Sequence, residues 1–277
     1  MAKIIVMHMS VDLDATSSAW LLKRYMPGCS DATYQFVPAG KTLEERPVDS
    51  DPNVLHVDTG MGVFDHHQFA DTSLSATKRV FDYLVQKNLL KEKDIDPLSR
   101  IVNFVTLIDH FGEVYFPDPT SDLYDFSLFQ LTEALKSAGK KDEEICEYIF
   151  TALDGILELF KKKINAESEI KLGFVFENKW GRALAVETQN EDTMKLAMKQ
   201  GFRTVVKRNP KTGAIRIKTL PEKDIDLTEV YEKIIKLDPD ATWFLHVGKH
   251  MLLNGSSKDP NSKPSSLTLK KVIEILS

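Results

Sequence analysis

Histidine and aspartate residues gather in four short groups near the start of this sequence. Carboxylate oxygens mixed with imidazole nitrogens suit divalent ions such as Mn²⁺, Mg²⁺ or Co²⁺ better than a structural zinc site. One such group carries little information, but the ordered set predicts a centre that binds two metal ions. The groups are His8-x-x-x-Asp12-x-Asp14, His56-x-Asp58-Thr59-Gly60, Asp65-His66-His67-Gln68 and Asp109-His110.

The first group follows an apolar run over residues 3–9 that is typical of a buried strand. Ligands of open parallel sheets bind beyond the carboxyl ends of the strands, which is where His8, Asp12 and Asp14 fall. The two aspartates are close together in a loop and can turn towards two neighbouring ions. Aspartate is also a favoured helix N-cap, so either one could simply begin the helix that follows.

Asp58 comes after another apolar run, and a carboxylate there could bridge two ions, as two-metal sites need. Because side chains alternate along a strand, we expect His56 and Asp58 to face the same side. The alternative is that Asp58 only starts a turn before Gly60, since both residue types form turns.

The adjacent histidines, His66 and His67, offer two different functions. One imidazole can bind a metal ion and the other can hold a substrate phosphate, while Asp65 can fix a histidine tautomer. Asp109 ends a long apolar helix, where the helix dipole disfavours a carboxylate. A nearby cation would remove that conflict, and so would exposure to solvent.

Strands and helices must alternate to position these groups. Apolar runs and helical spacing of apolar residues predict strands over 34–37 and 54–57 and helices over 14–25, 72–87 and 96–111. Such alternation indicates parallel pairing with crossover helices. We therefore expect an α/β fold whose amino-terminal domain contains a parallel sheet.

The pattern changes beyond residue 125, where helices come first and strands follow. The second of these helices would end at the Lys161-Lys162-Lys163 run, a favourable place for positive charge. A turn at 209–213 predicts that the last two strands form a hairpin. The predicted elements are helices over 126–138 and 143–164, strands over 172–176, 182–186, 204–208 and 214–218, and helices over 227–235 and 267–276.

These elements predict three parts: a metal-binding catalytic domain over 1–125, a helical linker over 126–168 and a smaller substrate-binding α/β domain over 169–277. The chain of 277 residues is longer than the roughly 100–200 residues of one domain. Its net charge of -5 gives no general attraction to nucleic acid. Two distant cysteines, Cys29 and Cys146, predict no disulfide framework and no thiolate zinc site. No signal peptide or membrane span is apparent, so we expect a cytosolic protein.

In order and type, the four groups resemble the motifs of the DHH phosphoesterase superfamily, which is named for the triplet seen here as Asp65-His66-His67. The resemblance is specific over residues 3–112 and weaker afterwards. Members include single-strand exonucleases, phosphodiesterases of short oligonucleotides and cyclic dinucleotides, and manganese pyrophosphatases. The resemblance implies a larger α/β domain with a parallel sheet, a helical linker and a smaller α/β domain that closes over the site.

The resemblance also implies a role for each residue. The first ion would be held by His8, Asp12 and Asp58. The second ion would be held by Asp14, Asp58, His66 and Asp109. His67 would contact the substrate phosphate, and His67, Asp65 and Asp58 would form the catalytic set. The implied cofactors are two divalent metal ions, Mn²⁺ first, with Mg²⁺ and Co²⁺ as alternatives.

The carboxy-terminal part departs from the family. It contains neither the Gly-Gly-Gly-Gly-His stretch of nuclease-type members nor the Ser-Arg-Lys-Lys stretch of pyrophosphatases. The loop over 246–263 lies where the glycine-rich stretch would be, and we predict that it binds substrate. The alternative is a plain surface loop, because Asn, Gly, Ser and Pro dominate it. The predicted substrate-binding residues, besides His67, are His250, Ser256, Ser257, Lys258 and Lys263.

We therefore predict a metal-dependent phosphoesterase acting on a phosphodiester or phosphomonoester of a small nucleotide or short oligonucleotide. A pyrophosphatase or polyphosphatase is the alternative within the same chemistry, and a non-catalytic sensor of metal and phosphate is the alternative outside it. The expected partner is a small phosphorylated substrate or a short single-stranded oligonucleotide, not a membrane, and a homodimer is left open. The basic segment over 203–218 has only Phe202 as an aromatic neighbour, which disfavours a processive nuclease.

Overall fold

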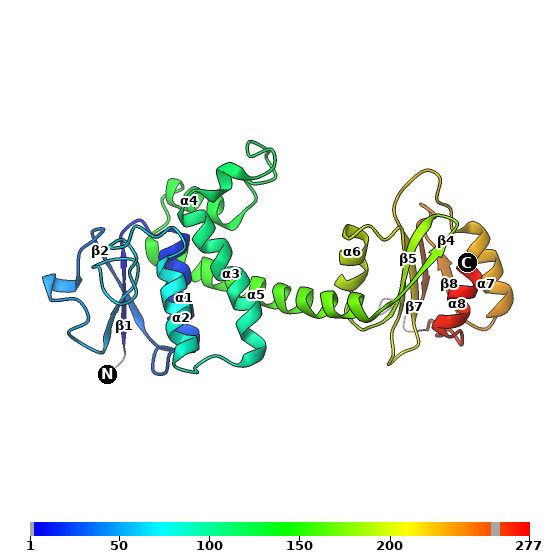
Figure 1. The fold of residues 1–277 in the computed structure, drawn as a ribbon, viewed down its shortest axis with the longest axis horizontal. Helices are drawn as coiled ribbons and strands as arrows, with labels where there is room; N and C mark the ends of the chain where they lie inside the picture. The colour runs from blue at the N-terminus through cyan, green and yellow to red at the C-terminus, as the bar shows by residue number, and fades with distance from the viewer. Residues whose placement is uncertain (1–2, 256–260) are drawn as a thin grey trace. The chain divides into compact units, whose positions relative to one another are not determined.

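The computed structural model describes residues 3–255 and 261–277 of an α/β protein. The chain divides into two compact units, Met1–Lys161 and Lys162–Ser277, each with its own sheet and hydrophobic core (Figure 1). The dividing point falls inside α5 (Asp142–Leu172), a helix of 31 residues. None of the helices in the described segments is long and apolar enough to cross a membrane.

Three parallel strands form the sheet of the first unit. They are β1 (Ile4–His8), β2 (Thr33–Val37) and β3 (Val54–His56), in the order β2-β1-β3. The central strand, β1, is the most deeply placed, with Ile5, Val6 and Met7 fully buried. The three predicted strands are confirmed, with ends displaced by no more than one residue.

Helices pack around this sheet and around one another. α1 (Leu13–Tyr25) contacts both α2 (Ala76–Gln86) and α3 (Glu92–Asp109), and Figure 1 shows α1 and α2 next to β1. α4 (Leu128–Ser137) and the first part of α5 complete the unit. α5 reaches β1 at Cys146, whose sulfur lies 3.9 Å from that of Met7. Cys146 and Cys29 are both free and buried.

The helix boundaries differ from the prediction in two informative places. α2 starts at Ala76 rather than at 72, because Ser75 caps it by accepting the N–H of Lys78. α5 continues to Leu172, so the prediction that the lysine run at 161–163 caps its end is wrong. Apolar residues at helical spacing continue beyond the lysines, and Ala166 and Ile170 are buried.

The second unit contains a mixed sheet covered on both faces. α7 and α8 pack on one face, while α6 and the end of α5 pack on the other (Figure 1). The strands are β4 (Phe174–Asn178), β5 (Gly181–Glu187), β6 (Thr204–Arg208), β7 (Ile215–Thr219), β8 (Trp243–Leu245) and β9 (Met251–Asn254), in the order β4-β5-β6-β7-β9-β8. The helices are α6 (Asp192–Lys199), α7 (Thr228–Leu237) and α8 (Leu269–Leu276).

Some of these elements were predicted and others were not. The hairpin of β6 and β7 is confirmed, and both strands lie within one residue of their predicted positions. α6, β8 and β9 were missed because they are short and flanked by polar residues. β9 interrupts the segment 246–263, which was expected to be a loop throughout.

Candidate metal centre

The carboxyl ends of β1 and β3 bring the sequence groups to one edge of the sheet. β1 ends at His8, and Asp12 lies in the loop that leads into α1. Asp58 follows β3, which pairs in parallel with β1. Asp109 is the last residue of α3. Neighbouring parallel strands end at the same edge, so ligands from distant parts of the sequence meet there.

The first group of donor atoms joins His8, Asp12 and Asp58. His8 Nε2 lies 3.2 Å from Asp58 Oδ2 and 3.6 Å from Asp12 Oδ2. Asp12 is also the N-cap of α1, because its Oδ1 accepts the N–H of Ala15 at 2.9 Å. The capping alternative and the ligand prediction are therefore compatible, since each uses a different oxygen of the carboxylate.

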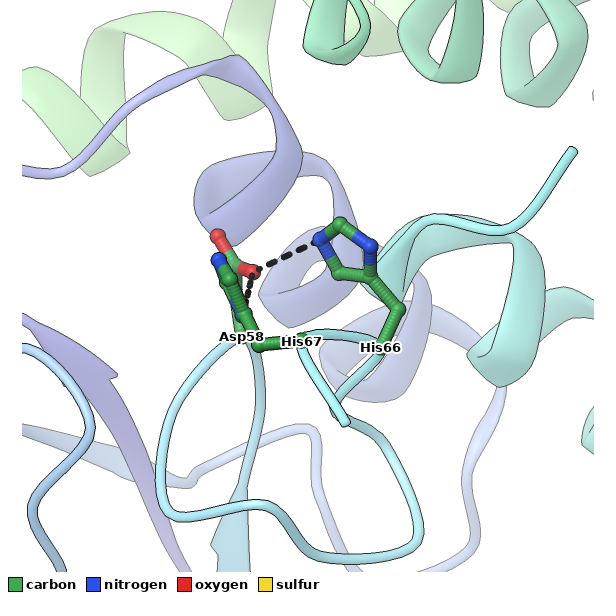
Figure 2. A group of neighbouring side chains, drawn as sticks. All are labelled: Asp58, His66 and His67. Atoms are coloured by element: carbon green, nitrogen blue, oxygen red, sulfur yellow. Dashed lines mark ion pairs between the residues drawn. The ribbon is translucent and has the colours of Figure 1, made fainter. Parts of the chain in front are cut away.

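The second group centres on the imidazole of His66. Its Nε2 lies 3.4 Å from Asp109 Oδ2, 3.5 Å from Asp58 Oδ1 and 3.7 Å from Asp14 Oδ2. Figure 2 shows the ion pairs that link Asp58 to His66 and to His67. Asp58 thus presents Oδ2 to the first group and Oδ1 to the second, which is the arrangement of a carboxylate that bridges two ions.

Asp14 has a second contact, with the start of α2. Its Oδ2 accepts the N–H of Ala76 at 2.7 Å, and its Oδ1 accepts the N–H of Thr77 at 2.9 Å. The carboxylate therefore satisfies backbone donors that the first turn of a helix leaves free. This ties α1 to α2 and fixes the oxygen that faces His66.

Asp65 lies beside His67 rather than beside His66. Its Oδ1 is 2.7 Å from His67 Nδ1, and its Oδ2 accepts the N–H of Met61 at 2.6 Å. Asp65 is buried, whereas 57% of the His67 side chain is exposed. A carboxylate only accepts hydrogen bonds, so Nδ1 of His67 carries the proton and Nε2 is left for a ligand.

The close approach of imidazoles and carboxylates changes their pKa values strongly. The Asp58 carboxylate, 3.5 Å away, followed by the charges of Asp109 and Asp14, raises the pKa of His66 to about 9 against the opposing effect of burial. Burial also lowers the pKa of His8, but hydrogen bonds to Asp12 and Asp58 prevail and raise it to about 11. The surrounding carboxylates therefore favour the protonated, positively charged form of both imidazoles.

The carboxylates of the centre respond in opposite directions. Burial raises the pKa of Asp58, but the neighbouring His66 and the hydrogen-bonded His8 outweigh it and hold the pKa at about 2. Burial, followed by repulsion from Asp58 and Asp109, raises the pKa of Asp14 well above its ordinary value. Burial likewise raises the pKa of Asp109 to about 6. Negative charge exceeds positive charge here, so the centre favours a cation.

The donor set also passes a direct test of fit to a metal ion. In the described part of the chain, Asp58 Oδ1, His66 Nε2 and Asp109 Oδ2 are buried and have no hydrogen-bond partner. A buried polar atom left unpaired costs about 1–3 kcal/mol. The three atoms belong to predicted ligands and lie close together. A divalent cation coordinated by all three would satisfy them at once.

Two histidines of the sequence groups have other partners. β3 ends at His56 and Asp58 has a left-handed φ of 55°, so the expectation that they share a strand face is wrong. His56 Nε2 instead accepts the N–H of Leu43 at 3.0 Å. His110 Nε2 lies 2.7 Å from the carbonyl oxygen of Leu74, which places it as a support for the neighbouring loop.

Sequence reasoning missed Asp142, in the first turn of α5. Its Oδ2 and Oδ1 accept the N–H groups of Ser10 and Val11, each at 3.0 Å. Ser10 has a left-handed φ of 60° and lies between His8 and Asp12. Asp142 therefore holds the loop that aims two candidate ligands. The only signal in the sequence is an acidic residue at the start of a helix, which is common.

The predicted substrate residues of segment 246–263 lie in the second unit. His250 Nδ1 is 3.3 Å from Thr219 Oγ1 on β7. Lys263 is held through its backbone, because its N–H donates to Thr242 Oγ1 at 3.0 Å. The residues Ser256, Ser257 and Lys258 lie outside the described residues. All predicted metal ligands lie in the first unit.

Comparison with known proteins gives weak similarities only. No family model matches the chain, and no curated protein matches it. Among solved structures, the chain is similar to an uncharacterized protein from Helicobacter pylori G27, with 13% identity, a TM-score of 0.29, and coverage of 98% of this chain and 97% of that one.

Two structures of RecJ show comparable similarity. RecJ from Thermus thermophilus in complex with Mg²⁺ has 11% identity and a TM-score of 0.31, and the match covers 100% of this chain and 55% of that one. This chain therefore spans about half the length of that protein. An exonuclease RecJ bound to manganese has 11% identity and a TM-score of 0.31, with coverage of 99% of this chain and 89% of that one.

Proposed function

We propose that this chain is a metal-dependent hydrolase of phosphate esters, acting on a phosphodiester or phosphomonoester of a small nucleotide or short oligonucleotide. The observation that carries the proposal is the set of three buried, unpaired donor atoms on Asp58, His66 and Asp109, within the described part of the chain. Asp58 also reaches the His8 group with its other oxygen. Two adjoining donor sets that share one carboxylate suit a two-metal hydrolytic site.

The predicted ligands and His67 would have separate roles. His8, Asp12 and Asp58 would hold one cation, and the other would be held by Asp14, Asp58, His66 and Asp109. Divalent ions bound here would acidify a water molecule and neutralise charge that develops on the phosphoryl oxygens. His67 would contact the phosphate through Nε2, because Asp65 occupies its Nδ1 and orients the ring. No serine or cysteine nucleophile is required.

The Asp58→Asn variant tests this assignment. Asparagine has the same shape and also tolerates a left-handed φ, so the fold should persist. Loss of the shared ligand should lower Mn²⁺-dependent hydrolysis by more than about 100-fold, the upper end of losses seen when a mere supporting residue is removed. The assay compares a dinucleotide, a short oligoribonucleotide, a cyclic dinucleotide, a nucleotide 3′-phosphate and pyrophosphate.

Asp31→Asn is the matched control, because Asp31 is exposed in the loop before β2, at the opposite edge of the sheet. It should hydrolyse at the wild-type rate. Normal turnover by Asp58→Asn would falsify the two-metal scheme. A wild-type protein that binds Mn²⁺ and hydrolyses nothing in the panel would instead be a sensor, and one that is fastest on pyrophosphate would be a pyrophosphatase.

A further inference from the structure

A cleft of about 300 Å³ opens beside the metal centre, within the first unit. Three predicted ligands, Asp12, Asp14 and Asp109, form part of its lining. Its volume is at the lower end of the range for small-molecule sites, which are mostly apolar with a few polar groups. The apolar part of the lining is Leu13, Val105, Ile108, Phe111 and Phe129.

Phe111 is the unusual member of this lining. It has a left-handed φ of 56°, and 73% of its surface is exposed. A bulky residue in that conformation is strained, and such strain clusters at functional sites. The turn is fixed by Gly112, where an added Cβ would lie 2.8 Å from the carbonyl oxygen of Leu107. The backbone therefore holds a large aromatic ring in solvent two residues from Asp109.

Besides the three predicted ligands, the polar lining contains Gln130 and two glutamates, whose carboxylates differ in their partners. Glu133 forms an ion pair with Lys136 at 2.7 Å, so its charge is compensated. Glu113 Oε2 is buried and, like the ligand atoms, has no hydrogen-bond partner within the described segments. Glu113 is thus the carboxylate of this cleft that best suits a hydrogen-bond donor on a ligand.

We infer that this cleft binds the nucleobase of the substrate, with Phe111 as a stacking surface and Glu113 as the acceptor for an exocyclic amino group. The inference rests on the proposed function. Apolar walls, an exposed aromatic ring and a carboxylate suit a flat, uncharged ring that donates hydrogen bonds. They do not suit a second phosphate, which the carboxylate repels. Cytosine should therefore be preferred over uracil, and nucleotide esters over pyrophosphate.

The dinucleotides CpC and UpU test the two residues separately, since their bases differ by an amino group in place of a carbonyl. Phe111→Ala should raise KM for both by about 5- to 150-fold, the value of stacking one base, with a smaller change in kcat. Glu113→Gln should remove most of an expected preference for CpC of at least about tenfold, because a charge-assisted hydrogen bond becomes a neutral one.

Tyr115→Ala is the control, because Tyr115 is an aromatic residue of the same segment, is 88% exposed and does not line the cleft. The Mn²⁺ affinity of Phe111→Ala, Glu113→Gln and Tyr115→Ala is measured by titration. It should be the same in all three variants, which would show that Asp109 has not moved. If the wild type hydrolyses both dinucleotides while Phe111→Ala and Glu113→Gln behave like Tyr115→Ala, the base subsite is wrong and the proposed function stands.

The proposed function fails only if the wild type hydrolyses none of the nucleotide esters of the panel above. In that case, and also if it hydrolyses other esters but neither dinucleotide, a binding experiment tests the base subsite. In the presence of Mn²⁺, cytidine monophosphate should then bind more tightly than ribose 5-phosphate, and Phe111→Ala should abolish the difference. Equal binding of the two compounds by the wild type would overturn the inference.

Discussion

Three of the predicted ligands of the candidate centre, His8, Asp12 and Asp14, are each oriented by hydrogen bonds to the backbone. His8 directs Nε2 into the centre because its Nδ1 lies 2.9 Å from the carbonyl oxygen of Met9. Asp12 uses one oxygen to cap α1, and Asp14 bonds two N–H groups of α2. Supporting contacts of this kind fix tautomers and orientations at metal sites. Substituting a supporting group should therefore weaken metal binding without removing a ligand.

The raised pKa values at the centre predict how stability depends on pH when metal is absent. Protonated His66 stabilises the fold below its ordinary pKa of 6.5, and this contribution is lost as the pH rises through about 9. Ionisation of Asp109 costs stability above the ordinary value of 3.8, up to a folded-state pKa of about 6. We expect the free energy of unfolding in chelator to fall between about pH 4 and 9.

Urea unfolding at pH 5, 7 and 9, with chelator and with Mn²⁺, measures this dependence. Mn²⁺ should remove most of the fall, because a cation replaces the protons that the ligands lose. His66→Gln should make the curve less steep between 6.5 and about 9, and the fall that remains there belongs to His8, whose pKa is about 11. A pH dependence that is the same with chelator, with Mn²⁺ and in His66→Gln would contradict this account.

At the scale of elements, the loop from β1 to α1 depends on α5. Asp142 accepts two backbone N–H groups of that loop, including that of the left-handed Ser10. Asp142→Ala should destabilise the protein by about 1.5–3 kcal/mol and weaken Mn²⁺ binding by about 10- to 100-fold. Adding Ser10→Gly should restore part of both, because glycine adopts this conformation without strain.

Glu143→Ala is the control for Asp142→Ala, since Glu143 is the exposed neighbour of Asp142 in the same turn. Its Mn²⁺ affinity, measured by calorimetry, should match that of the wild type. If Asp142→Ala lowers stability while Mn²⁺ affinity stays the same, Asp142 supports α5 rather than the ligand loop. Failure of Ser10→Gly to recover any affinity would show that strain at Ser10 is not the cause.

The elements that the sequence predicted are those with a strong apolar pattern. β1 is a short run of Ile, Val and Met, and the hairpin of β6 and β7 is marked by a Pro- and Gly-containing turn. α6 lacks such a pattern because charged residues, Asp192, Lys195 and Lys199, are spread through it, and β9 lacks one because it is set among the polar residues of segment 246–263. The roles of Asp142 and Phe111 could not be predicted from the sequence for another reason. Asp142 bonds to Ser10, 132 positions away, and Phe111 has a left-handed backbone; both features are set by tertiary structure.

At the scale of the whole molecule, the predicted metal ligands and His67 belong to the first unit, whereas His250 and Lys263 belong to the second. In the described segments, all groups of His and Asp that could hold a metal ion lie in the first unit. A fragment ending at Leu172, which keeps α5 whole, should therefore bind Mn²⁺ with an affinity within a few-fold of the full chain. Hydrolysis should fall if His250 and Lys263 contact the substrate.

The matched comparison is the second unit alone, from Gly173 to Ser277, which should show no specific Mn²⁺ binding by calorimetry. Circular dichroism establishes beforehand that each fragment is folded. Loss of Mn²⁺ binding by a folded first fragment would mean that the second unit supplies a ligand. Full hydrolytic activity of that fragment would contradict the prediction that His250 and Lys263 bind substrate.

Ser10, Asp58 and Phe111, each with a left-handed backbone, stand at or within two residues of predicted metal ligands. Such conformations persist only where surrounding structure enforces them. The conformational entropy of the ligand loops is therefore lost when the chain folds rather than when an ion arrives. An ion entering this centre meets donors already in place, and the cost of its capture is that of shedding its own water and of displacing the protons of His8 and His66.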